Sequence, residues 1–277
     1  MIATDHPSPA PSGAPVETPP PNIARVYDYL LGGKDNFESD RALGDRIAQA
    51  LPQVHLGVQQ QRAVLRRVVD FLVREAGLRQ LIDIGSGLPT AENVHQVAQR
   101  SAPETHVVYV DNDPAVLAHA RALLADNKQT VVTDGDLRHP AELLADPVLR
   151  AHIDFERPVG LLLCGILHYV LDDEDPYRVV RALVDELPSG SYVFVHHLIT
   201  AGPEVDADTA QAEAMLRQGV GRGQFRTSAE VAAFLDGLEL VPPGVVTVAE
   251  WRPDDETPSH DAHPVLRLAA VGVARKP

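Results

Sequence analysis

Short apolar segments alternate with helical patterns between residues 80 and 196, and this alternation restricts the fold more than any other feature of the chain. Signals that start a helix follow the segments, such as Asp113 directly before Pro114. Parallel strands need crossover connections of this length, and the connections are usually helices. The segments expected to form parallel strands are 80–85, 106–111, 129–134, 159–164 and 191–196.

Two further apolar segments near the C-terminus, at about 244–251 and 265–274, complete the predicted sheet. The link between them is short and polar, so these two strands are more easily antiparallel than parallel. The sequence therefore predicts an α/β fold: a doubly wound, mostly parallel, seven-stranded Rossmann-like sheet with an antiparallel C-terminal strand and an N-terminal helical cap.

The composition changes along the chain and divides it into three parts. Residues 1–21 are rich in proline and poor in large apolar residues, so we expect a disordered tail. Residues 22–76 carry three helical patterns and are expected to form a helical cap or lid. Residues 77–277 are the expected core, with a helical insertion near 200–240.

Charge and cysteine content exclude several classes of function. The 277 residues include 24 basic and 39 acidic side chains, and the net charge of −15 argues against a nucleic-acid partner. The single cysteine, Cys164, allows no intrachain disulfide and no metal site built on several cysteines, and we predict no metal. No apolar stretch predicts a membrane span or a signal peptide, so we expect a cytoplasmic protein. The sequence leaves the oligomeric state open.

The stretch "LIDIGSGLPT" (81–90) places a strand, a small-residue turn and a helix start in series. Gly85 and Gly87 let the backbone approach a ligand, and Asp111 ends the next strand, where a carboxylate can bind both ribose hydroxyls. This pairing predicts a nucleotide-type cofactor; the alternative is a tight turn without a ligand. A nicotinamide-dependent oxidoreductase is less favoured, because Thr90 stands where the dinucleotide fingerprint needs glycine and no Tyr-x-x-x-Lys occurs.

Successive motifs resemble those of class I S-adenosylmethionine-dependent methyltransferases, namely "IDIGSG", "YVDNDP", "TDGDL" and "GILHYV". More narrowly, "NIARVYDYLLGGKDNFESDR", "DIGSGLPT" and "GSYVFVHHLIT" are similar to a bacterial methyltransferase family known mainly as a domain of unknown function. The similarity runs from about residue 22 to the C-terminus. It implies S-adenosylmethionine as cofactor and methyl transfer to a small-molecule acceptor, whose identity it does not give.

The resemblance also implies roles for residues at the ends of the first two strands. Gly85, Ser86 and Gly87 would line the methionine moiety, and Asp83 would bind its ammonium group. Asp111 would hold the ribose hydroxyls, with Asn112 beside the adenine.

At the third and fourth strands, the resemblance implies contacts to the adenine and to the sulfonium. Asp136 and Leu137 would recognise the adenine edge, although Asp134 in the same motif is a rival for the carboxylate contact. Cys164 and Gly165 would form the floor beneath the sulfonium.

A methyl transfer needs a base only when the attacking group must lose a proton. His168 and Tyr169 follow the fourth strand and His196 ends the fifth, at the edge where such sheets bind ligands. We take them as candidate catalytic residues, with His168 first; the alternative for each is a structural role. His197 is a fourth position of the same kind.

The stretch "NIARVYDYLLGGKDNFESDR" precedes the first strand and is predicted to cover the cofactor. Asn22 is the expected N-cap of its helix. We expect Tyr29 or Tyr27 against the cofactor or acceptor, and Lys34 or Arg25 near the cofactor carboxylate. The alternative is an amphipathic helix followed by a solvated charged face.

A second function is compatible with the same motifs, namely a sensor or scaffold that binds S-adenosylmethionine without turnover. It predicts cofactor binding without product on any acceptor.

Overall fold

The computed structural model describes residues 19–89, 92–124, 126–200 and 206–277. Most of the predicted N-terminal tail, residues 1–18, lies outside this part of the chain, and so does Thr90.

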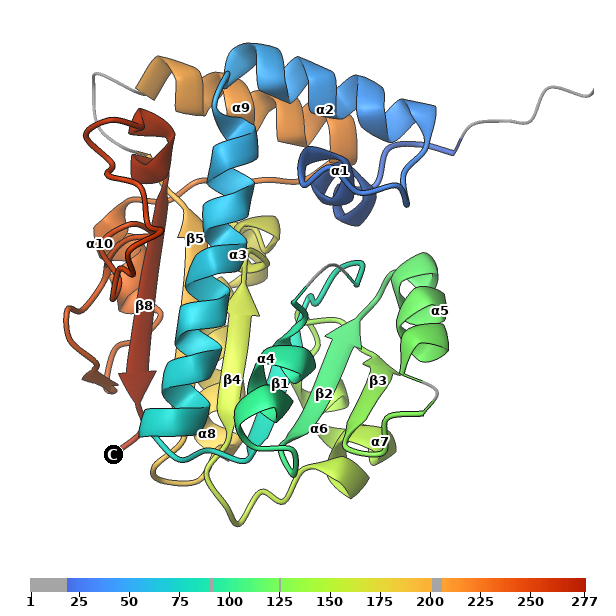
Figure 1. Ribbon diagram of the computed structural model, residues 1–277, viewed down its shortest axis with the longest axis vertical. Helices are drawn as coiled ribbons and strands as arrows, with labels where there is room; N and C mark the ends of the chain where they lie inside the picture. Colours follow the sequence, from blue (N-terminus) through green and yellow to red (C-terminus); the bar gives the residue numbers. More distant parts are fainter. Residues whose placement is uncertain (1–18, 90–91, 125, 201–205) are drawn as a thin grey trace, which may run out of the picture.

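An eight-stranded sheet in the order β3-β2-β1-β4-β5-β8-β6, with β7 also paired to β8, forms the centre of the described residues (Figure 1). The first five strands are parallel, and β8 is antiparallel to β5. The mostly parallel sheet and its antiparallel C-terminal strand confirm the predicted fold class, although the sheet has eight strands rather than the predicted seven, because the short strand β6 was not predicted. The strands are β1 (Gln80–Ile84), β2 (His106–Asp111), β3 (Thr130–Asp134), β4 (Gly160–Cys164), β5 (Tyr192–Leu198), β6 (Glu239–Leu240), β7 (Val246–Thr247) and β8 (Ala269–Arg275).

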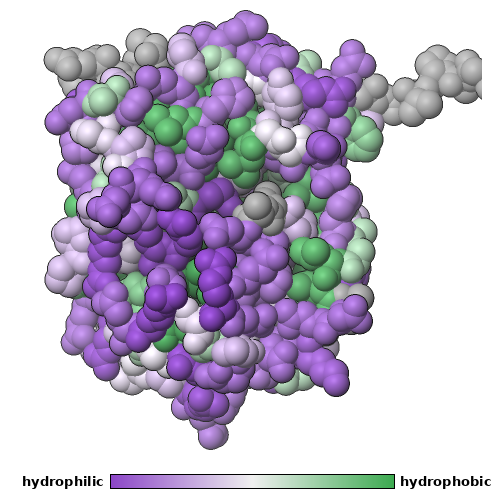
Figure 2. Space-filling view, in the orientation of Figure 1, coloured by the Kyte–Doolittle hydropathy of each residue, from purple (hydrophilic) through white to green (hydrophobic). Residues whose placement is uncertain are grey.

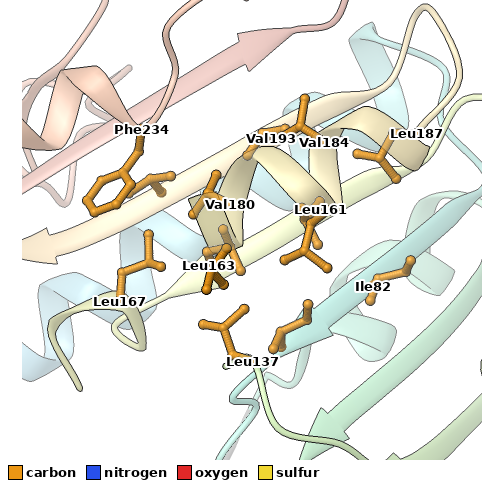
Figure 3. Close-up of a cluster of buried hydrophobic side chains, with 14 of the residues drawn as sticks. Ile82, Leu137, Leu161, Leu163, Leu167, Val180, Val184, Leu187, Val193 and Phe234 are labelled. Atoms are coloured by element: carbon orange, nitrogen blue, oxygen red, sulfur yellow. The ribbon is translucent and has the colours of Figure 1, made fainter. Parts of the chain in front are cut away.

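Helices cover both faces of the sheet, as doubly wound folds require. The face that carries Leu81 and Leu162 packs against α3 (Val54–Asp70), its π-helical continuation η1 (Phe71–Glu75) and α4 (Val94–Ser101). The opposite face carries Leu161 and Leu163 of β4, which lie toward α8 (Figure 3). The helices on that face are α6 (Pro140–Ala145), α7 (Pro147–His152), α8 (Pro176–Glu186) and α10 (Ser228–Ala233). Because the central strands are buried on both sides, their sequences are apolar throughout rather than alternating.

Helix α5 (Pro114–Leu123) lies beside β3, and Asp113 caps it as predicted. The capping box of Thr227 and Glu230 likewise starts α10. Both signals are local, so the sequence could identify them.

The predicted strand at 244–251 is mostly wrong, because only Val246–Thr247 pairs with β8. Side chains hold much of the rest of this segment. Trp251 is fully buried with its ring 6.0 Å from that of Phe71. The guanidinium of Arg67 donates to the carbonyls of Val248 at 2.7 Å and Trp251 at 3.2 Å. Carbonyls that bond an arginine in this way are satisfied without a neighbouring strand.

Three helices lie over the edge of the sheet at which the parallel strands end, and we call them the cap helices: α1 (Ile23–Leu30), α2 (Glu38–Ala50) and α9 (Asp206–Val220) (Figure 1). They share an apolar cluster that includes Val26, Leu43 and Leu216. Segments nearly two hundred residues apart therefore meet above the sheet. Asn22 caps α1 as predicted, accepting from the backbone of Ala24 at 2.9 Å.

Two buried carboxylates hold the turn between α1 and α2 in shape. Asp40 is fully buried and accepts from the backbone nitrogens of Asn22 at 2.9 Å and Phe37 at 2.8 Å. Asp28 accepts from the backbone nitrogen of Asp35 and the side chain of Asn36, both at 2.9 Å. The alternative of a solvated charged face therefore does not hold at Asp40, since this carboxylate binds backbone inside the cap.

Candidate active site

A cavity of about 590 Å³ lies between the cap helices, α3 and the edge of the sheet at which β1, β2 and β4 end. Ligands of open α/β sheets bind at this edge. Figure 2 shows green apolar surface in the upper part of the drawn face, where Figure 1 places α2, α3 and α9, with a mostly hydrophilic surface around it.

The turn after β1 brings bare backbone to the cavity. Gly85 and Gly87 have φ angles of +72° and +67°, which side chains other than glycine rarely adopt. A Cβ on Gly85 would also lie 2.6 Å from the side chain of Ile166. Ser86 lines the cavity between the two glycines.

Asp111 is fixed beneath this turn. Its carboxylate accepts from the backbone nitrogens of Gly87 at 2.9 Å and Asp113 at 3.0 Å. Burial raises the pKa of Asp111, and these hydrogen bonds partly oppose the rise. The carboxylate is thus held in one orientation at the end of β2, with Asn112 next to it on the cavity wall.

Asp83 is a carboxyl group in a largely apolar setting on the cavity wall. Burial raises its pKa to about 7, and the charge of Asp111 adds to the rise while the guanidinium of Arg62 opposes it. A buried carboxyl with such a pKa lacks a full counter-charge, so the site favours a cationic ligand group.

Arg62 also lines the cavity, although no motif in the sequence indicates it. It lies on the face of α3 that also presents Val58, Gln61 and Leu65, and its guanidinium donates to the carbonyl of Glu92 at 3.2 Å. The spacing of these residues marks one helix face. That spacing was available in the sequence, but nothing local indicated that the face lies above β1.

The third strand contributes Asp136 and Leu137 to the cavity, whereas Asp134 is exposed and is not among the described residues that line it. Asp136 forms an ion pair with Arg138 and accepts from the side chain of Asn112 at 3.3 Å. These donors lower the pKa of Asp136 to about 2. Of the two rival aspartates, the structure brings only Asp136 to the cavity.

Cys164 and Gly165 form part of the wall at the end of β4. The thiol of Cys164 accepts weakly from the amide of Gln61 at 3.8 Å, and burial raises its pKa to about 12. A Cβ on Gly165 would lie 2.5 Å from the nitrogen of the same amide. The cysteine is therefore protonated and suited to packing rather than to nucleophilic attack.

His168 and Tyr169 both line the cavity. Burial, and the neighbouring His197, His196 and Arg226, hold the pKa of His168 well below its usual value. Its Nδ1 has no hydrogen-bond partner among the described residues. Burial also raises the pKa of Tyr169. Both side chains are therefore neutral at physiological pH.

His196 is a candidate that the structure does not bring to the cavity. Strand β5 continues to Leu198, two residues beyond the predicted end, so His196 and His197 lie within the sheet and Leu198 reaches the cavity instead. Burial lowers the pKa of His196 to about 4. His197 is bonded to the buried guanidinium of Arg226 at 2.9 Å, which is a structural contact.

Of the side chains proposed from the first helix, Tyr27 lines the cavity and Tyr29 does not. Tyr29 packs on Gly44 of α2 and donates to Asp45 at 2.7 Å. Two residues on a helix point in directions about 200° apart, so only one of the two tyrosines can face the sheet.

The two basic side chains that were expected near the cofactor carboxylate do not line the cavity. Lys34 is exposed and is not among the described lining residues, and Arg25 is paired with Asp40 at 2.7 Å. The stretch contributes instead through Asn22, whose amide donates to the carboxylate of Asp113 and so links α1 to the loop after β2.

Within the described part of the chain, no group of three or more His, Cys, Asp or Glu side chains could hold a metal ion. No described helix is both long and apolar enough to cross a membrane.

Comparisons with a family model and with solved structures both relate this chain to methyltransferases. A model of a family described as S-adenosyl methyltransferase matches residues 9–277. A protein from Thermobifida fusca YX that is classed with the methyltransferases is 45% identical, with a TM-score of 0.89 over 93% of this chain and 95% of that one. A DUF574 family protein from Streptomyces avermitilis MA-4680 is 38% identical, with a TM-score of 0.87 over 93% and 98%.

More distant structures share the fold alone. An O-methyltransferase family protein from Burkholderia thailandensis is 15% identical, with a TM-score of 0.52 over 81% of this chain and 58% of that one. Comparison with curated proteins gives no match.

Proposed function

The chain belongs to the S-adenosyl methyltransferase family and is an S-adenosylmethionine-dependent methyltransferase, and from this we propose that it methylates a small molecule held beside His168 and Tyr169. The observation that carries the proposal is the form of the cavity. It has a polar wall with the groups that the cofactor needs, and it continues beneath the cap helices, where a second molecule would lie.

The polar wall suits the charges and hydroxyls of S-adenosylmethionine. Asp83, with its raised pKa, would pair with the ammonium group, and Arg62 would bind the carboxylate. The glycine turn would let the methionine part lie against backbone. Asp111 would accept from the ribose hydroxyls, because its carboxylate is already oriented by backbone donors.

The adenine would lie near Asn112, Asp136 and Leu137. Asp136 is ionised and accepts hydrogen bonds, so it suits the exocyclic amine of adenine. Its ion pair with Arg138 keeps the carboxylate in place before the cofactor binds.

The bound cofactor supplies an activated methyl group on a sulfonium ion. The protein then has to position the acceptor in line with that carbon and exclude water. Cys164, Gly165 and Tyr27 would surround the reacting carbon without offering a charged nucleophile of their own. Neutral His168 would accept a hydrogen bond or a proton from the acceptor.

Isothermal titration with S-adenosylmethionine tests the cofactor site. We expect saturable binding that Asp111→Ala abolishes. Asp134→Ala is the matched control, since it removes an exposed carboxylate from the end of the neighbouring strand and should leave binding unchanged. Absence of binding to the wild type, or selective binding of NAD, would refute the proposal. Binding without methylation of any acceptor would favour a sensor or scaffold instead.

A further inference from the structure

The part of the cavity beneath the cap helices differs in chemistry from the cofactor wall. Resting on the proposed methyl transfer, we infer that this part is the acceptor site and that it takes an uncharged molecule with a mostly aromatic or hydrocarbon body. We call this part the acceptor chamber, and its wall is formed by Leu30, Ile47, Val58, Ala212, Leu216 and Phe225.

The wall is apolar because four helices, together with Phe225 from the loop after α9, present apolar side chains to one space. Leu30 comes from α1, Ile47 from α2 and Val58 from α3. Ala212 and Leu216 stand one turn apart on α9. These side chains pack in one apolar cluster and also line the cavity, and a wall of this kind favours an apolar guest.

The charged groups on the cavity wall are engaged elsewhere. Arg222 is paired with Glu174 at 2.5 Å, and Arg138 is paired with Asp136 and with the same Glu174, at 3.4 Å for the latter. Arg62 interacts with Asp83 and is assigned to the cofactor. The carboxylates of Asp111, Asp113 and Asp136 likewise accept hydrogen bonds from the protein. We therefore assign no charged group of the described wall to an ionic acceptor.

An ionic acceptor would therefore lose its hydration without compensation. Burying an unpaired charge costs several kcal/mol, whereas covering apolar surface is favourable by about 25 cal/mol per Å². The difference selects a neutral molecule over a charged one of the same shape.

The polar groups at the junction of the chamber and the cofactor wall indicate which atom reacts. Cys164 and Tyr169 both act on the pKa of Tyr27, so the three side chains lie close together beside the expected position of the sulfonium. His168 is neutral and can accept a hydrogen bond from a hydroxyl there.

For a hydroxyl acceptor, the oxygen lone pair forms the bond to the methyl carbon. The carbon–sulfur bond breaks with its electron pair moving to sulfur, which becomes a neutral thioether. The hydroxyl proton leaves to the imidazole of His168 and then to water. Because the low pKa of this imidazole makes it a weak base, an acidic hydroxyl such as a phenol fits better than an alkyl alcohol.

Two probes with the same ring system test the chamber: 2-naphthol, which is neutral at pH 7, and 2-naphthoate, which is an anion. Dissociation constants are measured by fluorescence with saturating S-adenosylhomocysteine. We expect 2-naphthol to bind at least tenfold more tightly. Equal or tighter binding of 2-naphthoate, or no binding of either probe, would overturn the inference.

A pair of variants shows whether the probe occupies the chamber. Ala212→Phe places a ring in it and should weaken 2-naphthol binding at least tenfold while the affinity for S-adenosylhomocysteine stays the same. Val148→Phe, at an exposed position of α7, is the control and should change neither. If Ala212→Phe does not fold, Val58→Phe fills the chamber from α3. Unchanged 2-naphthol binding in a folded chamber variant contradicts the inference, whereas failure of the wild type to bind S-adenosylhomocysteine contradicts the proposed function itself.

Discussion

Cofactor binding should depend on pH through Asp83. A change from pH 8 to pH 6 protonates the carboxyl group of Asp83, whose pKa is about 7 in the free protein. Burial is the main cause of this pKa, so the neutral form dominates below pH 7. The ammonium group of the ligand requires the ionised form, and binding below pH 7 must therefore release a proton.

The magnitude follows from this pKa. At pH 6 about one molecule in eleven carries the ionised carboxyl, and at pH 8 about ten in eleven do, for a pKa of about 7. Affinity should therefore fall about tenfold from pH 8 to pH 6, which corresponds to about 1.4 kcal/mol. The other charged groups at Asp83 are Asp111, which raises its pKa, and Arg62, which lowers it.

Isothermal titration with S-adenosylhomocysteine, which keeps the ammonium group, measures the effect in buffers of different ionisation enthalpy. We expect release of about 0.9 proton at pH 6 and about 0.1 at pH 8, given a pKa of about 7. Asp83→Asn should bind more weakly and without the pH dependence. Asp134→Asn, at an exposed carboxylate, should keep it. Wild-type affinity that does not change with pH, or the same pH dependence in Asp83→Asn, would show that Asp83 does not pair with the ammonium group.

Three further substitutions test other parts of the structure. Arg62→Gln should weaken S-adenosylhomocysteine binding by roughly 1.5–3 kcal/mol, which is the contribution of a hydrogen bond to a charged group. Arg66→Gln, one turn later on the same helix, changes a guanidinium that is paired with a surface aspartate and should leave binding unchanged. Equal losses of affinity by calorimetry would show that Arg62 does not bind the carboxylate of the ligand. Asn22→Ala removes the cap of α1 and the bond to Asp113, so urea denaturation should show a loss of about 1 kcal/mol, and an unchanged midpoint would show that the cap contributes nothing. Trp251→Ala empties a fully buried site and should lower the free energy of unfolding by about 3–5 kcal/mol in the same assay. Trp251→Phe should lower it less. A decrease below about 1 kcal/mol for Trp251→Ala would mean that the surrounding side chains close the cavity.

Much of the fold could be predicted because its signals are local. The five parallel strands lie within or close to the predicted segments, and the caps at Asn22 and Asp113 start helices where expected. A cap acts on backbone two or three residues away, and an apolar run marks a buried strand wherever it lies in the sheet. The segment around Trp251 could not be predicted in this way, because its backbone is held by Arg67, far away in the sequence.

The candidate site was only partly predictable for the same reason. The glycine turn and Asp111 belong to one strand edge and reach the cavity as expected. Tyr27 instead of Tyr29, and Leu198 instead of His196, reach the cavity because of the rotation of one helix and the length of one strand. Whether a single side chain of this kind reaches the cavity depends on how its helix or strand packs against distant segments.

The mostly parallel α/β sheet, the order of its elements along the chain and the edge at which the cofactor motifs gather all follow from the amino-acid sequence. The folded chain alone shows that Arg62 acts on the pKa of Asp83, that Asp40 is buried inside the cap, and that α1, α2, α3 and α9 line one cavity. Strands and caps follow from interactions within a few residues, whereas a cavity and its charges follow from which helix faces meet across the whole chain. That choice is made by the burial of apolar surface, which depends on the total area covered and not on distance in the sequence.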